Sequence, residues 1–404
     1  MRLNRPGGVA LSLLPPLALY VHIPWCVRKC PYCDFNSHER SGPLPEKEYI
    51  ARLMQDLEAM LPSVWGRRLT SVFIGGGTPS LFSPDSIDAL LAGARARLPL
   101  EPGAEITLEA NPGTVEAARF RGFRAAGVNR ISIGVQSFDD AMLAALGRIH
   151  SAAEANRAIE AALASFDNVN VDLMYALPGQ SLAMMQADIE RATKSGVPHV
   201  SAYQLTIEPN TVFYSKPPRL PEHDAAADMQ VAVEETLAAA GFEHYETSAF
   251  ARPGRRCRHN LNYWEFGDYL GIGAGAHGKV SFPERVTRHE RIKQPAEYMK
   301  GSSDVPSRVV APSELPFEFM LNALRLTEGF PASLFQERTG LPLISIQREL
   351  EMGEKLGLLE RDWRRIAPSE RGRLFLNDLL ALFVGESTAR GSGVRVSGPA
   401  TRTS

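Results

Sequence analysis

The chain has 404 residues, a length that allows one large core and a smaller second domain. Hydrophobic residues make up 44% and charged residues 22%, as in ordinary globular proteins, and the net charge of -2 provides no global field that would attract nucleic acid. Four cysteines, three of them clustered, do not form a disulfide framework and suit a reducing cytosol, so we expect a cytoplasmic protein. The apolar stretch 11–19 contains two prolines, is too short to span a bilayer and lacks a small-residue cleavage site, so we expect no signal peptide.

The first predicted strand, residues 18–23, is rich in β-branched and aromatic residues and is ended by Pro24. Cys26, Cys30 and Cys33 follow it in a short loop, with the spacing C-x3-C-x2-C. Three thiolates are one fewer than a tetrahedral zinc site or an ordinary four-iron cluster uses. A four-iron cluster held by three cysteines leaves one iron free to bind something else, and we interpret that open position as the function.

Other readings of the three cysteines remain open. A structural zinc ion could be completed by His22 or His38, although the spacing lacks the paired C-x2-C halves of common zinc modules. Three unrelated buried thiols are a further alternative. A disulfide would leave one thiol of the cluster unpaired.

Strands and helices alternate along the first 250 residues. We expect strands at 18–23, 71–74, 105–110, 130–136, 168–175 and 199–206. We expect helices at 45–61, 84–98, about 114–126, 181–194 and 223–240, and helical sequence from the end of the strand 130–136 to residue 164. Such alternation implies parallel βαβ units, so the predicted fold class is α/β, with a partial (β/α)6 TIM-like barrel. An open doubly wound sheet is the alternative. In barrels of this kind the chemistry lies at the carboxyl ends of the strands.

Polar and glycine residues gather at those strand ends. Glu109, Gln136, Arg148 and Asp172 each lie at or just beyond the end of a predicted strand. Each alone could be an ordinary surface residue, but together they predict a polar ring on one rim of an otherwise apolar barrel. The run 75–77 of three glycines after the second strand lets the backbone approach a ligand, although a tight turn is the simpler reading.

The last 100 residues predict a separate, mostly helical domain. Helices at 314–326, 331–339 and 344–356 precede two short strands and a final helix at 373–383, an order that resembles a winged-helix module. The third helix carries Arg348 and Lys355 against three glutamates and is not basic, so we expect no nucleic-acid partner. We expect this domain to cover the barrel or to bind a partner protein. The predicted segments are an N-terminal segment 1–17, the barrel 18–250, an extension over the barrel mouth 251–306, the winged-helix-like domain 307–385 and a disordered tail 386–404.

The cysteine spacing after a strand, with Tyr32 just before the last cysteine, resembles the radical S-adenosylmethionine superfamily. The resemblance implies a [4Fe-4S] cluster on Cys26, Cys30 and Cys33, whose open iron chelates S-adenosylmethionine and whose electron, supplied by a donor, yields an adenosyl radical. The family's glycine-rich turn contacts the methionyl amino end of the cofactor. By position this role falls on Gly76, Gly77 and Thr78.

Further cofactor contacts follow from the same resemblance. Tyr20 matches a cofactor-contacting tyrosine, and Glu109, Gln136, Arg148 and Asp172 match the family's cofactor-binding positions. Arg148 would suit the carboxylate of the cofactor. Asp172 or Gln136 would suit its ribose hydroxyls.

The fuller string Y-x-H-I-P-x-C-x3-C-P-Y-C-D-F resembles the oxygen-independent coproporphyrinogen oxidases and, more closely, their heme-chaperone relatives of the HemW type. The string H-N-x-x-Y-W at 259–264 is shared with the chaperones. His259 and Tyr263 could ligate heme iron and Trp264 could stack on a porphyrin, or these side chains could be hydrogen-bonded inside a loop that caps the barrel. Ala276 and His277 are expected near the adenine.

Two departures favour the chaperone over the oxidase. The oxidases carry a further cysteine two positions after the third, where this chain has Phe35, and they have a longer segment ahead of the cluster, where this chain has 25 residues before Cys26. The resemblance therefore implies heme as cargo and an acceptor protein, which can be membrane-associated. Cys257, the distant thiol, is expected to be incidental.

Overall fold

The central sheet contains the six predicted parallel strands in neighbouring positions. The computed structural model describes residues 8–114, 117–301 and 305–384. The parallel strands are β1 (Leu17–Ile23), β4 (Leu69–Gly76), β5 (Leu100–Ala110), β6 (Arg130–Gln136), β7 (Val169–Tyr175) and β8 (His199–Gln204). In the described residues, β8 pairs with β7 on one side and with a short antiparallel strand on the other, and it does not pair with β1. The barrel is therefore open. The predicted α/β fold is confirmed.

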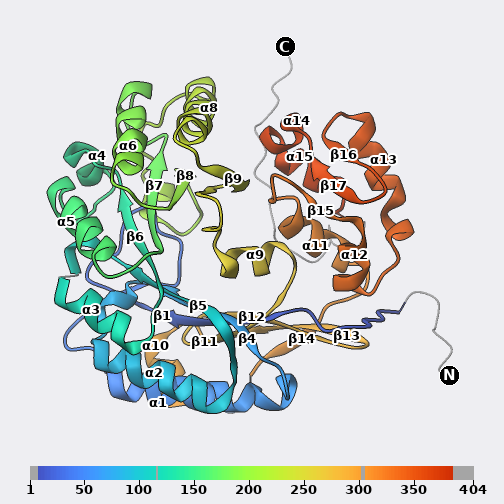
Figure 1. Ribbon diagram of the computed structural model, residues 1–404, viewed down its shortest axis with the longest axis horizontal. Helices are drawn as coiled ribbons and strands as arrows, with labels where there is room; N and C mark the ends of the chain where they lie inside the picture. The colour runs from blue at the N-terminus through green and yellow to red at the C-terminus, as the bar shows by residue number, and fades with distance from the viewer. Residues whose placement is uncertain (1–7, 115–116, 302–304, 385–404) are drawn as a thin grey trace.

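Helices follow the strands as predicted. The six long ones are α1 (Glu46–Met60), α2 (Pro84–Arg97), α3 (Ala117–Ala126), α5 (Ala152–Leu163), α6 (Leu182–Lys194) and α8 (His223–Ala239), with short helices α4 (Asp140–Ala145) and α7 (Val212–Ser215) between them. Ser83 caps α2 by accepting a hydrogen bond from Ser86 N, and Ser151 and Glu154 form a capping box at α5. Figure 1 shows these helices on the outer side of the sheet.

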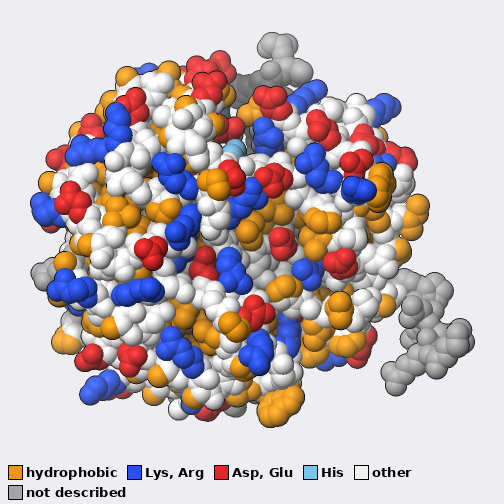
Figure 2. Space-filling model, viewed as in Figure 1, with side chains coloured by type: hydrophobic (Ala, Val, Ile, Leu, Met, Phe, Trp, Pro, Cys, Tyr) orange, Lys and Arg blue, Asp and Glu red, His pale blue; other side chains and the backbone are white. Residues whose placement is uncertain are grey.

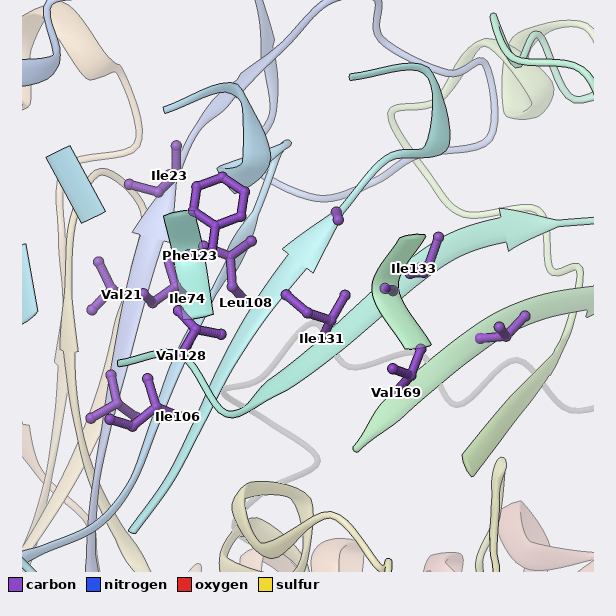
Figure 3. Close-up of a cluster of buried hydrophobic side chains, with 14 of the residues drawn as sticks. Val21, Ile23, Ile74, Ile106, Leu108, Phe123, Val128, Ile131, Ile133 and Val169 are labelled. Atoms are coloured by element: carbon purple, nitrogen blue, oxygen red, sulfur yellow. The ribbon is translucent and has the colours of Figure 1, made fainter. Parts of the chain in front are cut away.

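The apolar side chains of the strands face these helices. Figure 3 shows Val21, Ile74, Ile106 and Ile131 in one buried cluster with Phe123 of α3. The alternate residues of the strands face the inside of the barrel, as the two-residue period of a strand requires. The expectation of an otherwise apolar barrel is wrong here, because these inward residues are mostly polar. They include Ser71, Glu105, Thr107, Arg130, Ser132, Asn170, His199 and Ser201, all buried.

The sheet is larger than the sequence indicated. β11 (Asp268–Ile272) lies parallel to the free side of β1, and β12 (His277–Phe282), β13 (Arg285–Glu290) and β14 (Ser307–Val309) continue it antiparallel. β10 (Ala249–Ala251) and β9 (Glu243–Glu246) extend the other edge beyond β8. The region 251–306, expected to cap the mouth, also contributes α9 (Arg258–Trp264) and α10 (Pro295–Lys300). α9 contacts β4 and β1 from the inner side of the sheet (Figure 1).

The C-terminal residues form a small helical domain beside the barrel (Figure 1). It contains α11 (Leu315–Ala323), α12 (Ala332–Thr339), α13 (Gln347–Lys355), α14 (Glu370–Leu374) and α15 (Leu376–Ala381), with β15 (Phe330–Pro331), β17 (Arg365–Pro368) and β16 (Leu359–Arg361) as a three-stranded sheet. The last predicted helix is thus two helices, separated at Phe375. The domain has its own apolar core, and Arg288 of β13 pairs with Glu318 of α11 at 2.7 Å across the contact.

The predicted disordered tail 386–404 and the first seven residues lie outside the described residues. In the described part of the chain, no helix is long and apolar enough to cross a membrane. On the face in Figure 2, Lys and Arg side chains are interspersed with Asp and Glu.

Candidate functional site

The cysteine loop begins where β1 ends. Pro24 separates β1 from β2 (Trp25–Cys26), which pairs in parallel with β3 (His38–Glu39) and so closes the loop at its base. Cys30 and Cys33 lie within the loop, where Cys33 N donates to Cys30 O at 3.2 Å. All three thiols are free and partly exposed. The loop therefore carries three accessible sulfur ligands on one rigid strand end.

The loop does not hold a preformed metal site as it stands. Among the described residues, no group of three or more His, Cys, Asp or Glu side chains is placed to hold a metal ion. Burial raises the pKa of Cys26 and Cys33, whereas hydrogen bonds from Thr78 to Cys26 and from Ser37 to Cys33 lower it. The donor set of three thiols fits an iron–sulfur cluster in chemistry, since such clusters bind thiolates, and it would leave one position of a four-iron cluster without a protein ligand.

The alternative zinc ligand His22 is already engaged. Its Nε2 donates to Asn36 O at 2.9 Å, so its Nδ1 accepts from Tyr20 OH at 2.9 Å. His38 Nε2 lies 3.1 Å from Asn36 Oδ1. Zinc binding by His22 would have to break one of its two hydrogen bonds, which disfavours that alternative.

The glycine turn after β4 packs directly on the start of the cysteine loop. A Cβ at Gly77 would lie 2.6 Å from Trp25 O, and a Cβ at Gly76 would lie 2.5 Å from the His22 ring, so neither position has room for a side chain. Gly77 N donates to Ile23 O at 2.7 Å, and Thr78 N donates to Trp25 O at 2.8 Å. These amide donors are used within the protein, so the turn does not offer them to a ligand.

Two carboxyl groups are close enough to affect each other, Glu109 near the end of β5 and Asp172 in the middle of β7, so the prediction that Asp172 lies at a strand end is wrong. Glu109 accepts a hydrogen bond from Gly76 N at 3.0 Å, which ties it to the glycine turn. Burial, together with the nearby charge of Asp172, raises the pKa of Glu109 to about 8. Burial also raises the pKa of Asp172, against hydrogen bonds from Asn170 and Ser132. These two groups are therefore placed together, and each would gain from a cationic or hydrogen-bond-donating ligand.

Arg148 joins the strand ends to the cysteine loop. Its Nη2 donates to Gly134 O at 2.6 Å, and its Nη1 lies 3.6 Å from Cys30 Sγ. Its Nε is buried without a hydrogen-bond partner. A small hollow lies here; it is lined by Val27, Arg28, Cys30, Thr78, Asn111, Gly147, Arg148 and Ile149.

Gln136, at the end of β6, has the left-handed backbone angle φ of 69°, which is unusual for a residue with a side chain. Ala176, just after β7, has φ of 57°. Backbone strain of this kind is concentrated at functional sites in other proteins. Both strained residues lie at the carboxyl edge of the sheet.

Ala276 and His277 lie at the start of β12, beyond β11. Ala276 is buried, and its N donates to Gly273 O at 3.0 Å while its O accepts from Arg291 N at 2.9 Å. His277 is exposed, with Nε2 3.8 Å from Glu290 Oε1. Burial lowers the pKa of His22, and the charge of His277 adds a small further lowering.

The shared H-N-x-x-Y-W string forms α9, which lies inside the barrel. The His259 ring stacks on Phe73 of β4 with centroids 5.0 Å apart, and its Nδ1 lies 2.9 Å from Ser71 Oγ. Its Nε2 is buried without a partner, and burial lowers its pKa to about 3, so the ring is neutral. Tyr263 meets the His259 ring edge-on at 4.9 Å. His259 is only 1% exposed, so heme iron could reach Nε2 only if α9 moved.

A polar network beneath the rim was missed from the sequence. It comprises Ser132, Asn170, His199, Ser201, Tyr245 and Cys257, all buried and joined by hydrogen bonds. The signal was present: polar residues alternate with apolar ones in Arg130–Gln136 and 168–172. Such alternation indicates a second, polar face to each strand.

Comparison with known proteins agrees with this geometry. Residues 20–192 match the Radical SAM superfamily, and residues 310–375 match the HemN C-terminal domain. Coproporphyrinogen III oxidase (HemN) from Escherichia coli has the same fold, with a TM-score of 0.77 over 92% of this chain and 90% of that chain at 22% identity. The fold and the cysteine loop thus define a radical S-adenosylmethionine protein with a HemN-type C-terminal domain.

Sequence identity to curated proteins identifies the family within this class. The heme chaperone HemW of Escherichia coli (strain K12) is 51% identical over 380 residues, and that of Haemophilus influenzae is 48% identical over 379, each match covering 92% of this chain and 99% of the relative. Mouse radical S-adenosyl methionine domain-containing protein 1, mitochondrial, is 37% identical over 382 residues, covering 90% of this chain and 86% of that protein. The chain belongs to the HemW family.

Proposed function

We propose that this protein is a heme chaperone that binds a [4Fe-4S] cluster and S-adenosylmethionine and transfers heme to an acceptor protein. The observation that carries this proposal is the 51% identity to a named heme chaperone over 92% of the chain. The loop supports it, because the position two residues after Cys33 holds Phe35, 66% exposed, in place of the oxidases' further cysteine.

The cluster would be held by Cys26, Cys30 and Cys33, and bound S-adenosylmethionine would supply a one-electron, radical chemistry. The chain's own residues would bind and orient the cofactor. Arg148, next to Cys30, suits a carboxylate, since a guanidinium pairs well with it. Glu109 suits an amino group.

The remaining contacts are proposed by position. Asp172 or Gln136 would meet the ribose, and Tyr20, Gly76, Gly77, Thr78, Ala276 and His277 would line the cofactor. The ring of Tyr20 lies 6.3 Å from that of Phe73, and its hydroxyl bonds to His22 Nδ1, whose ring abuts Gly76 of the glycine turn.

His259 is the candidate heme ligand, with Tyr263 second. Its imidazole is neutral and Nε2 lacks a partner, so Nε2 would be free to ligate iron in the tautomer in which Nδ1 donates its proton to Ser71 Oγ. The partners would be heme or a related porphyrin, an acceptor protein that can be membrane-associated, and an electron donor for the cluster. We place the protein in the cytoplasm.

The second candidate function is oxygen-independent coproporphyrinogen oxidation, an enzymatic radical decarboxylation. The observation that favours it is the close likeness of fold to coproporphyrinogen III oxidase. A shared fold does not specify the reaction, and the identity is only 22%.

A paired assay separates the two. Purified full-length protein is titrated with hemin, and a saturable Soret band supports the chaperone. His259→Ala should weaken that band, whereas His223→Ala, on the exposed start of α8, serves as the control. In parallel, cluster-loaded protein is incubated anaerobically with coproporphyrinogen, S-adenosylmethionine and a reductant. Release of carbon dioxide without hemin binding would establish the oxidase in place of the chaperone.

A further inference from the structure

A chain of buried hydrogen bonds runs from Cys257, the N-cap of α9, to the Asp172 carboxylate. Cys257 N donates to Tyr245 OH at 3.2 Å, and Tyr245 OH lies 2.8 Å from His199 Nε2. His199 Nδ1 lies 2.5 Å from Asn170 Oδ1, and Asn170 Nδ2 donates to Asp172 Oδ1 at 2.8 Å. The four residues behind Asp172 are at most 1% exposed.

The direction of every bond in this chain is fixed. The Asp172 carboxylate can only accept, so Asn170 turns Nδ2 toward it and Oδ1 toward His199 Nδ1. Nδ1 must then carry the proton of the neutral ring, which leaves Nε2 to accept from Tyr245 OH. Burial lowers the pKa of His199 far below its usual range, so the ring carries one proton, which lies on Nδ1 and is donated to Asn170 Oδ1. Ser201 Oγ donates to the same oxygen at 3.1 Å. The amide of Asn170 is therefore held with its nitrogen toward Asp172.

Each oxygen of Asp172 accepts one hydrogen bond from this network. Asn170 Nδ2 also donates to Ser132 Oγ at 2.7 Å, so the Ser132 hydrogen is free to go to Asp172 Oδ2, at 3.0 Å. A carboxylate has about four acceptor sites, and two of them are used here. The remaining sites accept hydrogen bonds, so a partner of Asp172 must be a donor such as a hydroxyl pair.

The far end of the chain is also anchored. Glu105 of β5 accepts hydrogen bonds from Arg258 N at 3.2 Å and from His259 N at 3.1 Å, and Cys257 Sγ lies 3.4 Å from it. The first turn of α9 is thus fixed to the sheet, and through Tyr245 it fixes His199.

We infer that Asn170, backed by His199, is a positioning residue that fixes the Asp172 carboxylate as an acceptor for the ribose hydroxyls of the cofactor. This inference rests on the proposed function, because it takes Asp172 as a cofactor contact. Asn170 is only 1% exposed and acts on the cofactor through its hydrogen bond to Asp172.

The test compares S-adenosylmethionine with its 2′-deoxy and 3′-deoxy analogues, titrated calorimetrically into cluster-loaded, anaerobic full-length protein. In the wild type, at least one analogue should bind roughly tenfold more weakly than S-adenosylmethionine, because one hydrogen bond to a charged group is lost. In Asn170→Leu, the affinity for S-adenosylmethionine should fall by roughly tenfold, because Asp172 Oδ1 loses its hydrogen-bond donor. The discrimination, which is the ratio of analogue to S-adenosylmethionine dissociation constants, should fall toward one.

Rescue by a similar residue separates positioning from general packing. His199→Asn places an amide nitrogen near the position of Nδ1 and should retain the discrimination, whereas His199→Leu should reduce it. Thr107→Val removes a buried hydroxyl that has no hydrogen-bond partner and should leave the discrimination unchanged.

An unchanged discrimination ratio in a folded Asn170→Leu protein would overturn the positioning role, as would a wild type that binds both analogues as well as S-adenosylmethionine. If Asn170→Leu does not fold, Ser132→Ala takes its place. In that variant the ratio of analogue to S-adenosylmethionine dissociation constants should fall by roughly threefold. An unchanged ratio would overturn the positioning role. A cluster-loaded wild type that does not bind S-adenosylmethionine at all would instead refute the proposed function.

Discussion

Glu109 should make the stability of the protein fall as the pH rises. Burial raises its pKa to about 8 in the folded chain, whereas the unfolded chain loses the proton near the ordinary value of 4.5. Between these two values the folded state binds the proton and the unfolded state does not, so raising the pH across this window favours unfolding. Below pH 4.5 both states are protonated and the effect is absent.

The magnitude follows from the shift. One pKa unit corresponds to 1.36 kcal/mol, so a fully buried group with this shift would lower the free energy of unfolding by roughly 4–5 kcal/mol by pH 8. The Glu109 side chain is partly exposed, and allowing for solvent screening about 2 kcal/mol is a better figure. With an unfolding entropy of about 2.1 cal/mol/K per residue, this corresponds to roughly 2–3 °C in melting temperature.

The variant Glu109→Gln cannot ionise and should avoid this loss. Its melting temperature, measured by calorimetry without cofactor, should match the wild type near pH 5 and exceed it by roughly 2–3 °C near pH 8.5. Glu160→Gln, on the exposed face of α5, is the control and should show no such divergence. If Glu109→Gln and the wild type differed by the same amount at both pH values, Glu109 would be ionised throughout and the two carboxyl groups would not be coupled as the structure indicates.

Three further expectations concern the cysteine loop and its supports. Cys30→Ala should abolish the brown cluster absorbance after anaerobic reconstitution while Cys257→Ala retains it, and full iron and sulfide in the first variant would refute the ligand assignment. Gly77→Ala should lower the melting temperature and the cluster content, because its Cβ would lie 2.6 Å from Trp25 O, whereas Gly42→Ala, with nothing within 4 Å, should behave as wild type. Asp268→Asn should cost about 3–5 kcal/mol, or roughly 4–6 °C in melting temperature, because it leaves buried Lys279 without its charge partner at 2.9 Å. Burial alone would raise the pKa of Asp268, but Lys279 and Arg67 lower it overall. The difference in melting temperature between this variant and the wild type should therefore shrink in strong acid, where Asp268 is protonated. A constant difference down to pH 2 would contradict this assignment.

The parallel strands were predictable because each carries apolar residues in a short run or at alternate positions and is followed by a turn and a helix. Ser83 before Pro84 predicted the start of α2 correctly, since cap and first-turn residues act locally. β11 was not predictable in the same way. It follows α9 rather than a crossover helix of the barrel, and its parallel pairing with β1 joins residues about 250 positions apart.

The candidate site was predictable where a local motif sets it. The cysteine spacing and the glycine turn are local features, and the structure brings them together through bonds such as Thr78 N to Trp25 O. The coupling of Glu109 with Asp172 needed the structure, because it depends on the spacing of two non-adjacent strands. The polar network was overlooked because each of its members, read alone, is an ordinary strand residue.

Helix α9 links the two proposed sites. Its N-cap Cys257 and its first turn are tied to Tyr245 and Glu105, which hold the network behind Asp172. His259 lies in that same turn and packs on Phe73. Heme iron cannot reach the buried His259 Nε2 unless α9 shifts. A shift of α9 would also break the bond from Cys257 N to Tyr245, which orients His199. If His259 ligates heme, then heme binding and the affinity for the cofactor act on the same helix, and by reciprocity each must change the other.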